Sequence, residues 1–361
     1  KWAYHGDRAW AAQAVERNGK WYWYVCLNDA DKNDVLAVAV ADDPQGPYVD
    51  AIGGPLATGF SFIDPTVMID DDGTPWMCWG NGTCFLVKLK KNMIELDGEI
   101  MVLPMENYVE GPWIYKRDGH YYNVYASMGH PLETISYAMA DNIEGPWTFM
   151  GELTGMAKDS FTIHPGIIDY KGKSYVFGLC YDIFRLETPR HAERRSAVAA
   201  EMHYNEDGTI QMLPYFQDCE LNQIEPLNPF RKVEAETIAW GYGLKTTPRR
   251  AWGTHSTNQI VTNIDENEFI LVKGVDFGKG AKTFKVCAST HLMGGTIELH
   301  LDSKSGPMIG KVKVGNTKDE YIEFETPVKN AKGVHDLYLV FKGGDFQQRN
   351  LFFLDWWEFT K

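Results

Sequence analysis

Two acidic side chains in apolar surroundings are the residues of this sequence best suited to do chemistry. Asp64 stands in the segment FSFIDPTVM, and Glu110 precedes Gly-Pro-Trp in ENYVEGPW. Burying a carboxylate is costly unless it is paired, and burial raises the pKa of a carboxyl group, as a general acid requires. Two such groups facing one cavity are what glycoside hydrolysis uses. An aspartate in a turn before proline and a glutamate in an edge loop are the ordinary alternatives, and both stay open here.

Other polar and aromatic residues accompany these acids. His164, in FTIHPGI, is interpreted either as a satisfied structural group or as the ligand of a water or a cation. Arg195, in ERRSAVAA, either lies at the surface or reaches a carboxylate or a sugar hydroxyl. We expect three aromatic residues to contribute to a sugar pocket: Trp10, Trp113 and Phe62.

A recurring hairpin motif determines where these side chains stand. Glycine turns between strand-like aromatic runs are 54, 46 and 53 residues apart, at Gly19, Gly73, Gly119 and Gly172. Asn-Gly and Asp-Gly turns favour hairpins because their residues tolerate positive φ. Several short strands in a repeat of about 50 residues are typical of a β-propeller. No helical pattern intervenes, so we expect an all-β propeller with the acids at inner strand ends.

The repeat pattern stops before the C-terminal third of the chain. Residues 213–231 lose the alternation and carry three prolines, so we expect a linker there. Between residues 232 and 361, short alternating strands such as GGTIELHLD and LFFLDWWEF follow one another. Such strands between Gly-rich turns are typical of a β-sandwich. We therefore divide the chain into residues 1–212, 213–231 and 232–361.

Composition narrows the classes of partner. The chain of 361 residues is 44% hydrophobic, enough for packed cores, and its formal charge is −14. A negative surface repels nucleic acid and anionic membranes, and no apolar run approaches the roughly 20 residues of a membrane span. We expect neither as a partner, and the sequence does not reveal the oligomeric state. The six cysteines indicate no disulfide framework, although Cys78 and Cys84 could meet across a hairpin.

Residues 8–212 resemble glycoside hydrolase family 43. The segments similar to its blades are DRAWAAQAVERNGKWYWYV, FIDPTVMIDDDG, EGPWIYKRDGHYYNVYA, HPGIIDYKGKSYVF and RRSAVAAEMHYNEDGTI. The resemblance implies a five-bladed propeller that inverts the anomeric centre, with Glu110 as general acid and Asp64 as the residue that tunes its pKa. It also implies that His164 is associated with a central Ca²⁺. An inverting mechanism places acid and base about 6.5–9.5 Å apart, with a water between base and sugar.

The general base implied by this resemblance has no counterpart in the sequence. In the family the base is an Asp of the first blade, in an Ala-Asp-Pro context. Asp7 is the sole acid upstream of Trp10, and it does not stand in that motif. We therefore expect the first blade to be missing from this chain, which is then a fragment or a propeller lacking its base.

Residues 232–361 resemble a family 6 carbohydrate-binding module, on segments such as VEAE, VKGVDFG and LFFLDWWEF. The resemblance implies a jelly-roll sandwich with a structural Ca²⁺ bound by Glu234, Glu236 and Asp355. The two aromatic residues of its sugar cleft fall near Phe269 and Tyr321, but Phe353 occupies the position of the family's Asn. Sugar binding and a purely structural role of the module both stay open.

These features predict an inverting glycoside hydrolase. Its substrate would be arabinoxylan-type plant polysaccharide or its oligosaccharides, from which it releases terminal α-L-arabinofuranosyl or β-D-xylosyl units. The alternative is a non-catalytic carbohydrate-binding protein with a degenerate propeller. The sequence does not rank arabinose above xylose. A polymeric substrate favours a secreted or periplasmic protein, whereas uptake of oligosaccharides would place it in the cytoplasm.

Overall fold

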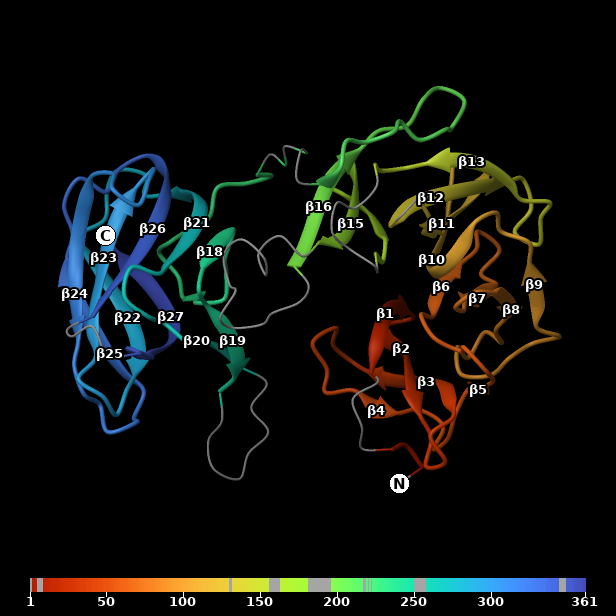
Figure 1. The fold of residues 1–361 in the computed structure, drawn as a ribbon, viewed down its shortest axis with the longest axis horizontal. Coiled ribbons are helices and arrows are strands. Elements are labelled where there is room, and N and C mark those ends of the chain that lie inside the picture. Colours follow the sequence, from red (N-terminus) through yellow and green to blue (C-terminus); the bar gives the residue numbers. More distant parts are fainter. Residues whose placement is uncertain are drawn as a thin grey trace. The chain divides into compact units, whose positions relative to one another are not determined.

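The computed structural model describes residues 2–4, 9–129, 132–155, 163–180, 196–216, 219, 221, 223–249, 258–343 and 349–361. These residues form strands, turns and loops without an α-helix, so the all-β expectation is confirmed for them, and none of their elements is a helix able to cross a membrane. The chain divides into two compact units (Figure 1). Unit 1 comprises Lys1–Cys180 and Ala197–Leu221, and unit 2 includes Asn222–Lys361.

Four antiparallel sheets form the described part of unit 1 and follow one another in chain order around it (Figure 1). The first contains β1 (Trp10–Arg17), β2 (Lys20–Asn28), β3 (Asp34–Ala41), β4 (Val49–Asp50) and β5 (Ala57–Thr58). The second contains β6 (Thr66–Ile69), β7 (Pro75–Trp79), β8 (Cys84–Lys88) and β9 (Met101–Leu103). The third contains β10 (Tyr108–Arg117), β11 (His120–Met128), β12 (Glu133–Ala140) and β13 (Thr148–Glu152). The fourth contains β14 (Gly166–Tyr170), β15 (Lys173–Cys180) and β16 (Ser196–Met202).

The predicted hairpin turns are confirmed in the first, third and fourth sheets. Two-residue loops with positive φ at both positions join the strands at Asn18-Gly19, Asp118-Gly119 and Lys171-Gly172. Such loops twist in the same sense as the strands they connect, which is why they suit hairpins. The turn between β6 and β7 of the second sheet is longer. It is closed by a hydrogen bond from the amide of Asp70 to the carbonyl of Thr74.

Apolar clusters between successive sheets hold unit 1 together. On β7, Met77 and Trp79 pack against the first sheet, while the alternate residues Trp76 and Cys78 pack against the third. This alternation follows from the period of two in a strand, and it buries β7 on both faces. Burial of each large apolar side chain contributes about 1.5–3 kcal/mol. A third cluster joins the third and fourth sheets, and no cluster of the described residues joins the fourth sheet to the first.

No disulfide joins the six cysteines, all of which belong to the described residues. Cys78 and Cys84 do meet across the β7–β8 hairpin, where their sulfur atoms are 3.4 Å apart. Both are buried, and the amide of Asn123 donates to each sulfur. Burial raises the pKa of Cys78 well above that of a free thiol, so it is uncharged at neutral pH.

Unit 2 is a β-sandwich, as the alternating strands predict. One sheet contains β17 (Val233–Glu234), β19 (Lys245–Pro248), β20 (Gln259–Thr262), β22 (Thr283–Ser289), β25 (Ile322–Pro327) and β27 (Phe353–Thr360). The other contains β18 (Trp240–Tyr242), β21 (Phe269–Asp276), β23 (Gly295–Leu301), β24 (Met308–Val314) and β26 (Val334–Gly343). One apolar cluster, which includes Trp357 and Phe341, fills the space between them.

Parts of the expected linker, residues 213–231, pack onto the two units. Tyr215 and Phe216 join the apolar cluster of the third and fourth sheets of unit 1. Leu227 and Phe230 lie against the core of unit 2, where Leu227 also bridges to Val275. These segments therefore contribute to the cores on either side.

Candidate active site

Asp64 is a buried carboxylate on a strained backbone. Asp64 is only 5% exposed, and its backbone φ angle is +59°. Aspartate tolerates this left-handed region better than most residues, but the conformation still costs free energy and persists only where neighbouring contacts enforce it. One such contact is the hydrogen bond from the amide of Gly80 to the carbonyl of Ile63, at 2.9 Å. The segment before β6 is thereby held to the end of β7.

Asp64 lies beside the two positions that follow it in the repeat pattern. The amide of Gly111 donates to Oδ2 of Asp64 at 3.2 Å, and Nδ1 of His164 lies 4.0 Å from the same oxygen. Gly111 has a φ of +62°, and a Cβ atom there would lie 2.7 Å from Nδ1 of His164. Only glycine allows this close approach. The second, third and fourth sheets thus converge on one carboxylate.

Glu110 precedes Gly111 on β10 and is half-buried. It lies opposite Ala126 of β11, between two irregularities of the β10–β11 register. Such bulges turn a side chain away from the direction a regular strand would give it. The side-chain amide of Asn81, in the β7–β8 turn, donates to Oε2 of Glu110 at 2.7 Å. Sequence reasoning did not identify Asn81, whose one signal was its place between two glycines, Gly80 and Gly82.

Two of the predicted pocket aromatics lie next to these groups. Trp10 is exposed, and its carbonyl accepts a bond from the Cys26 thiol at 3.3 Å. The same thiol contacts the backbone of Asp64, so Trp10 and Asp64 flank one side chain. Trp113 is half-buried, and its ring lies beside Gly166 at the start of β14. Their use as pocket walls remains a prediction.

Phe62, predicted to contribute to the sugar pocket, lies in the apolar core. Its ring packs in the apolar core, 5.2 Å from the ring centres of both Trp79 and Phe85, and the residue is 7% exposed. A turn in which the amide of Phe62 bonds to the carbonyl of Gly59 directs this ring inward. The same turn leaves the side chain of Phe60 in solvent, where the residue is 93% exposed. Arg195, the other predicted sugar ligand of this unit, lies outside the described residues.

The two aromatic residues expected in the sugar cleft of unit 2, Phe269 and Tyr321, lie in different surroundings. Phe269 lies on the outer side of its sheet, because its neighbour Ile270 points into the core. Tyr321 directly precedes β25 of the other sheet, and the guanidinium of Arg249 lies 4.1 Å from its ring centre. Each ring has other partners, Tyr338 for Phe269 and Arg249 for Tyr321, and a sugar cleft formed by this pair stays a prediction.

The three predicted calcium ligands of unit 2 lie near one another. β17, which carries Glu234, pairs with β27, which carries Asp355. Burial, and then the negative charges of Glu234 and Asp355, raise the pKa of Glu236, whose buried Oε2 has no hydrogen-bond partner. Asp355 already accepts bonds of 2.7 Å from Arg249 and from Asn258. No group of three or more acidic, His or Cys side chains among the described residues is arranged to hold a metal ion.

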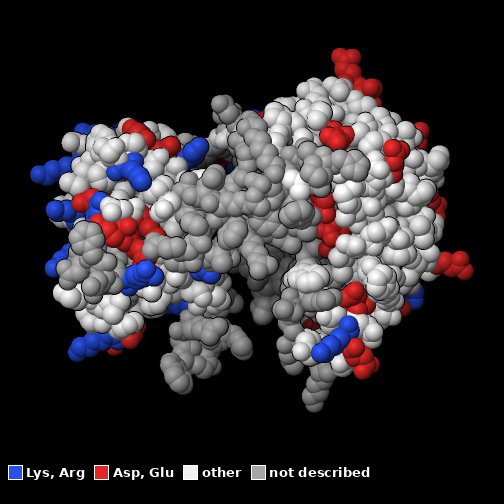
Figure 2. Space-filling view, viewed as in Figure 1, with Lys and Arg blue, Asp and Glu red and all other residues white. Residues whose placement is uncertain are grey.

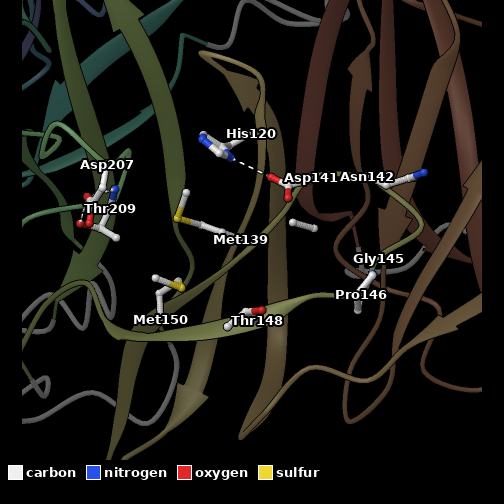
Figure 3. Close-up of a pocket in the computed structure, with 11 residues that line it drawn as sticks. His120, Met139, Asp141, Asn142, Gly145, Pro146, Thr148, Met150, Asp207 and Thr209 are labelled. Carbon is white, nitrogen blue, oxygen red and sulfur yellow. Dashed lines mark hydrogen bonds and ion pairs between the residues drawn. The ribbon is translucent and has the colours of Figure 1, made fainter.

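A cavity of about 460 Å³ lies elsewhere on unit 1 (Figure 3). Its lining includes His120 and Asp141, which are 3.1 Å apart, together with Met139 and Met150. Neither Asp64 nor Glu110 lines it. His120 and Ala126, the partner of Glu110, are six residues apart on β11, which corresponds to about 20 Å. The cavity is therefore distinct from the acidic site.

Among the charged side chains on the face of unit 1 seen in Figure 2, Asp and Glu prevail, whereas the face of unit 2 seen there carries many Lys and Arg together with Asp and Glu. The charge distribution of unit 1 is that expected from the excess of 49 Asp and Glu over 35 Lys and Arg in the whole chain. An anionic polymer would be repelled from such a surface, and a neutral one would not.

Comparison with known proteins relates both units to described families. The model of glycosyl hydrolases family 43 matches residues 1–210, and that of the family 6 carbohydrate-binding module matches residues 234–361. An arabinoxylan arabinofuranohydrolase of Paenibacillus polymyxa is 32% identical over the whole chain, which spans 61% of that protein. One of Bacillus subtilis (strain 168) is 31% identical, again over the whole chain and over 76% of its own length.

A solved structure shows the same relation. It is a family 43 arabinoxylan arabinofuranohydrolase of Bacillus subtilis in complex with cellotetraose. Its TM-score to this chain is 0.82 at 29% identity, and the match covers 98% of this chain and 80% of that one. The propeller and sandwich architectures of the two units therefore agree with a structure determined for a related protein.

Proposed function

The chain belongs to glycosyl hydrolases family 43, and from this premise we propose that it hydrolyses glycosidic bonds of arabinoxylan or its oligosaccharides. The units released are terminal α-L-arabinofuranosyl or β-D-xylosyl residues. The observation that carries the proposal is the junction of the two acid segments, in which the amide of Gly111, next to Glu110, donates to Asp64. A binding protein has no need of a buried carboxylate held beside a second one.

Each acid has a distinct part in this proposal. Glu110 is the general acid that gives its proton to the leaving oxygen, so that the departing sugar does not leave as an alkoxide. Asp64 is the neighbouring negative charge, which favours the protonated form of Glu110 and orients the sugar. The general base, which activates the attacking water, is not assigned to a described residue.

The relatives support arabinose as the released sugar. Two proteins at 31–32% identity are arabinoxylan arabinofuranohydrolases, and the chain spans 61% of the length of one and 76% of the other. A xylosidase/arabinosidase of Bacteroides ovatus is 28% identical over 58% of this chain. Because a polymer cannot enter a cell, the proposal further favours a secreted or periplasmic protein.

The test is the identity and anomeric form of the sugar released from soluble arabinoxylan. We expect arabinose to exceed xylose in chromatograms of the products. We also expect the anomeric proton in early NMR spectra to show the inverted configuration. Release of neither sugar, with the polymer still bound to the protein, would instead favour the non-catalytic binding protein.

We also propose a calcium ion at Glu234, Glu236 and Asp355 of unit 2. What supports it is the buried, unpartnered oxygen of Glu236 and the repulsion among three carboxyl groups, which a cation would relieve. The pairing of Asp355 with Arg249 opposes it. A calcium ion near His164 in unit 1 is a further proposal, supported only by the position of that ring beside Asp64.

Calcium should therefore stabilise unit 2. At a concentration about 100 times its Kd, a ligand bound only to the folded state adds about 2.7 kcal/mol to the free energy of unfolding. We expect thermal unfolding of this unit to shift upward with CaCl₂ and back with EDTA. Glu236→Gln should abolish the shift, whereas Glu320→Gln, an exposed control in the same unit, should keep it. A shift of equal size in both variants would place the ion elsewhere.

A further inference from the structure

The turn between β7 and β8 connects the segments that carry the two acids. The amide of Gly80 donates to the carbonyl of Ile63, next to Asp64, at 2.9 Å. Two residues later the amide of Gly82 donates to the carbonyl of Val109, next to Glu110, at 2.7 Å. One short turn thus holds the backbone on the N-terminal side of both acids.

Asn81, the second residue of the β7–β8 turn, bonds to the carboxyl group of Glu110 itself. It lies between the two backbone contacts, and its Nδ2 donates to Oε2 of Glu110 at 2.7 Å. The hydroxyl of Tyr108, the first residue of β10, also donates to the carbonyl of Gly80 at 2.7 Å, which is a further bond between the turn and β10. The amide is therefore presented to Glu110 from a fixed backbone.

We propose that Asn81 is a positioning residue for the general acid. Nδ2 of Asn81 donates and Oε2 of Glu110 accepts, which leaves Oε1 as the oxygen that carries the proton of the carboxyl group. Asn81 thereby selects which oxygen delivers the proton to the glycosidic bond and holds the carboxyl plane in that orientation. The inference rests on the proposed role of Glu110 as the acid.

An amide suits this task because it does not titrate. The neighbouring segments already carry ionisable groups, among them Asp64 and His164, and a charged donor beside them would add a further charge to the cluster. A displacement of about 1 Å at a reacting group can cost about 100-fold in rate. Loss of the Asn81 bond should therefore act on proton delivery more than on substrate binding.

The experiment compares Asn81→Ala and Asn81→Asp with the unsubstituted chain on aryl α-L-arabinofuranosides of graded leaving-group pKa. Aspartate has the size of asparagine but cannot donate when ionised and accepts the proton of Glu110 instead, so both variants remove the bond that Asn81 donates. For poor leaving groups, which need protonation, we expect kcat to fall about 10- to 100-fold with little change in KM. For 2,4-dinitrophenolate, which leaves unprotonated, kcat should stay within about threefold, because no proton delivery is needed.

Asn92→Ala is the matched control. Asn92 also lies in a turn of the second sheet, and its Nδ2 donates to a glutamate, Oε1 of Glu95, at 2.5 Å. This pair is exposed, so its loss should leave all rates unchanged. Equal losses on every leaving group in Asn81→Ala, or none on any, would overturn the proposal.

A second measurement separates this inference from the proposed function. If Glu110→Gln retains full activity on poor leaving groups, the assignment of the acid fails, whatever Asn81 does. Carbon relaxation of the Glu110 side chain reports its order without any turnover. Asn81→Ala should make that side chain more mobile while Asn92→Ala should not, and unchanged order in Asn81→Ala would contradict the positioning role.

Discussion

Replacing Glu110 by glutamine should lower kcat/KM about 10²- to 10⁴-fold on substrates with poor leaving groups. Glutamine keeps the shape of the side chain, and its oxygen can still accept the bond from Asn81, but it has no proton to give. The loss should shrink as the leaving group becomes more acidic, because such a group departs without protonation. Steady-state kinetics on natural arabinoxylan oligosaccharides and on 2,4-dinitrophenyl glycosides measure the difference.

Glu106→Gln is the matched control for this substitution. Glu106 is an exposed glutamate four residues earlier, at the entry to the same sheet. Its substitution should leave kinetics unaltered, and neither variant should change the thermal unfolding midpoint. A loss in Glu110→Gln that is independent of the leaving group would argue against general acid catalysis by this residue.

Gly111→Ala should destabilise unit 1 and disrupt the site. Alanine at a φ of +62° costs about 1–2 kcal/mol, because its Cβ crowds the backbone. That Cβ would also lie 2.7 Å from His164, and relief of such overpacking costs about 1–3 kcal/mol more. Because the amide of Gly111 bonds to Asp64, any shift of this backbone moves the two acids relative to each other. We expect the free energy of unfolding to fall by about 2–5 kcal/mol and activity to fall about 100-fold.

Gly119→Ala separates the strain from the clash. Gly119 belongs to the same sheet and has a φ of +87°, but a Cβ there would meet no atom within 4 Å. This variant should lose only the backbone contribution, about 1–2 kcal/mol, and keep full activity. Chemical denaturation measures the free energy of unfolding of both variants, and steady-state kinetics measure their activity. Equal stability and activity in the two would mean that the contact with His164 is unimportant.

The local pattern of the sequence predicted the hairpins and the class of fold. Asn-Gly and Asp-Gly turns between alternating strands have a strong intrinsic preference, so the turns at Gly19 and Gly119 formed as predicted. The repeat also predicted that Asp64 and the segment of Glu110 would lie together, because equivalent positions of successive sheets occupy equivalent places. The alternating strands of the C-terminal part likewise sufficed to predict a sandwich.

Only the tertiary structure decided which side chain points where. The aromatics Phe60 and Phe62 are both close to Asp64 in sequence, and a turn sends one into solvent and the other into the core. Phe269 and Tyr321 were expected to form a pair, and the structure places Phe269 on β21 and Tyr321 directly before β25 of the other sheet.

By itself, therefore, the sequence determined the strands, the turns and the approximate place of the acids, because these depend on residues close in the chain. The partners of the acids depend on contacts between distant segments. Asn81 and Glu110 are 29 residues apart, and Asp64 and Gly111 are 47 apart. No local preference encodes such pairs, since the packing of one sheet on the next brings them within hydrogen-bonding distance.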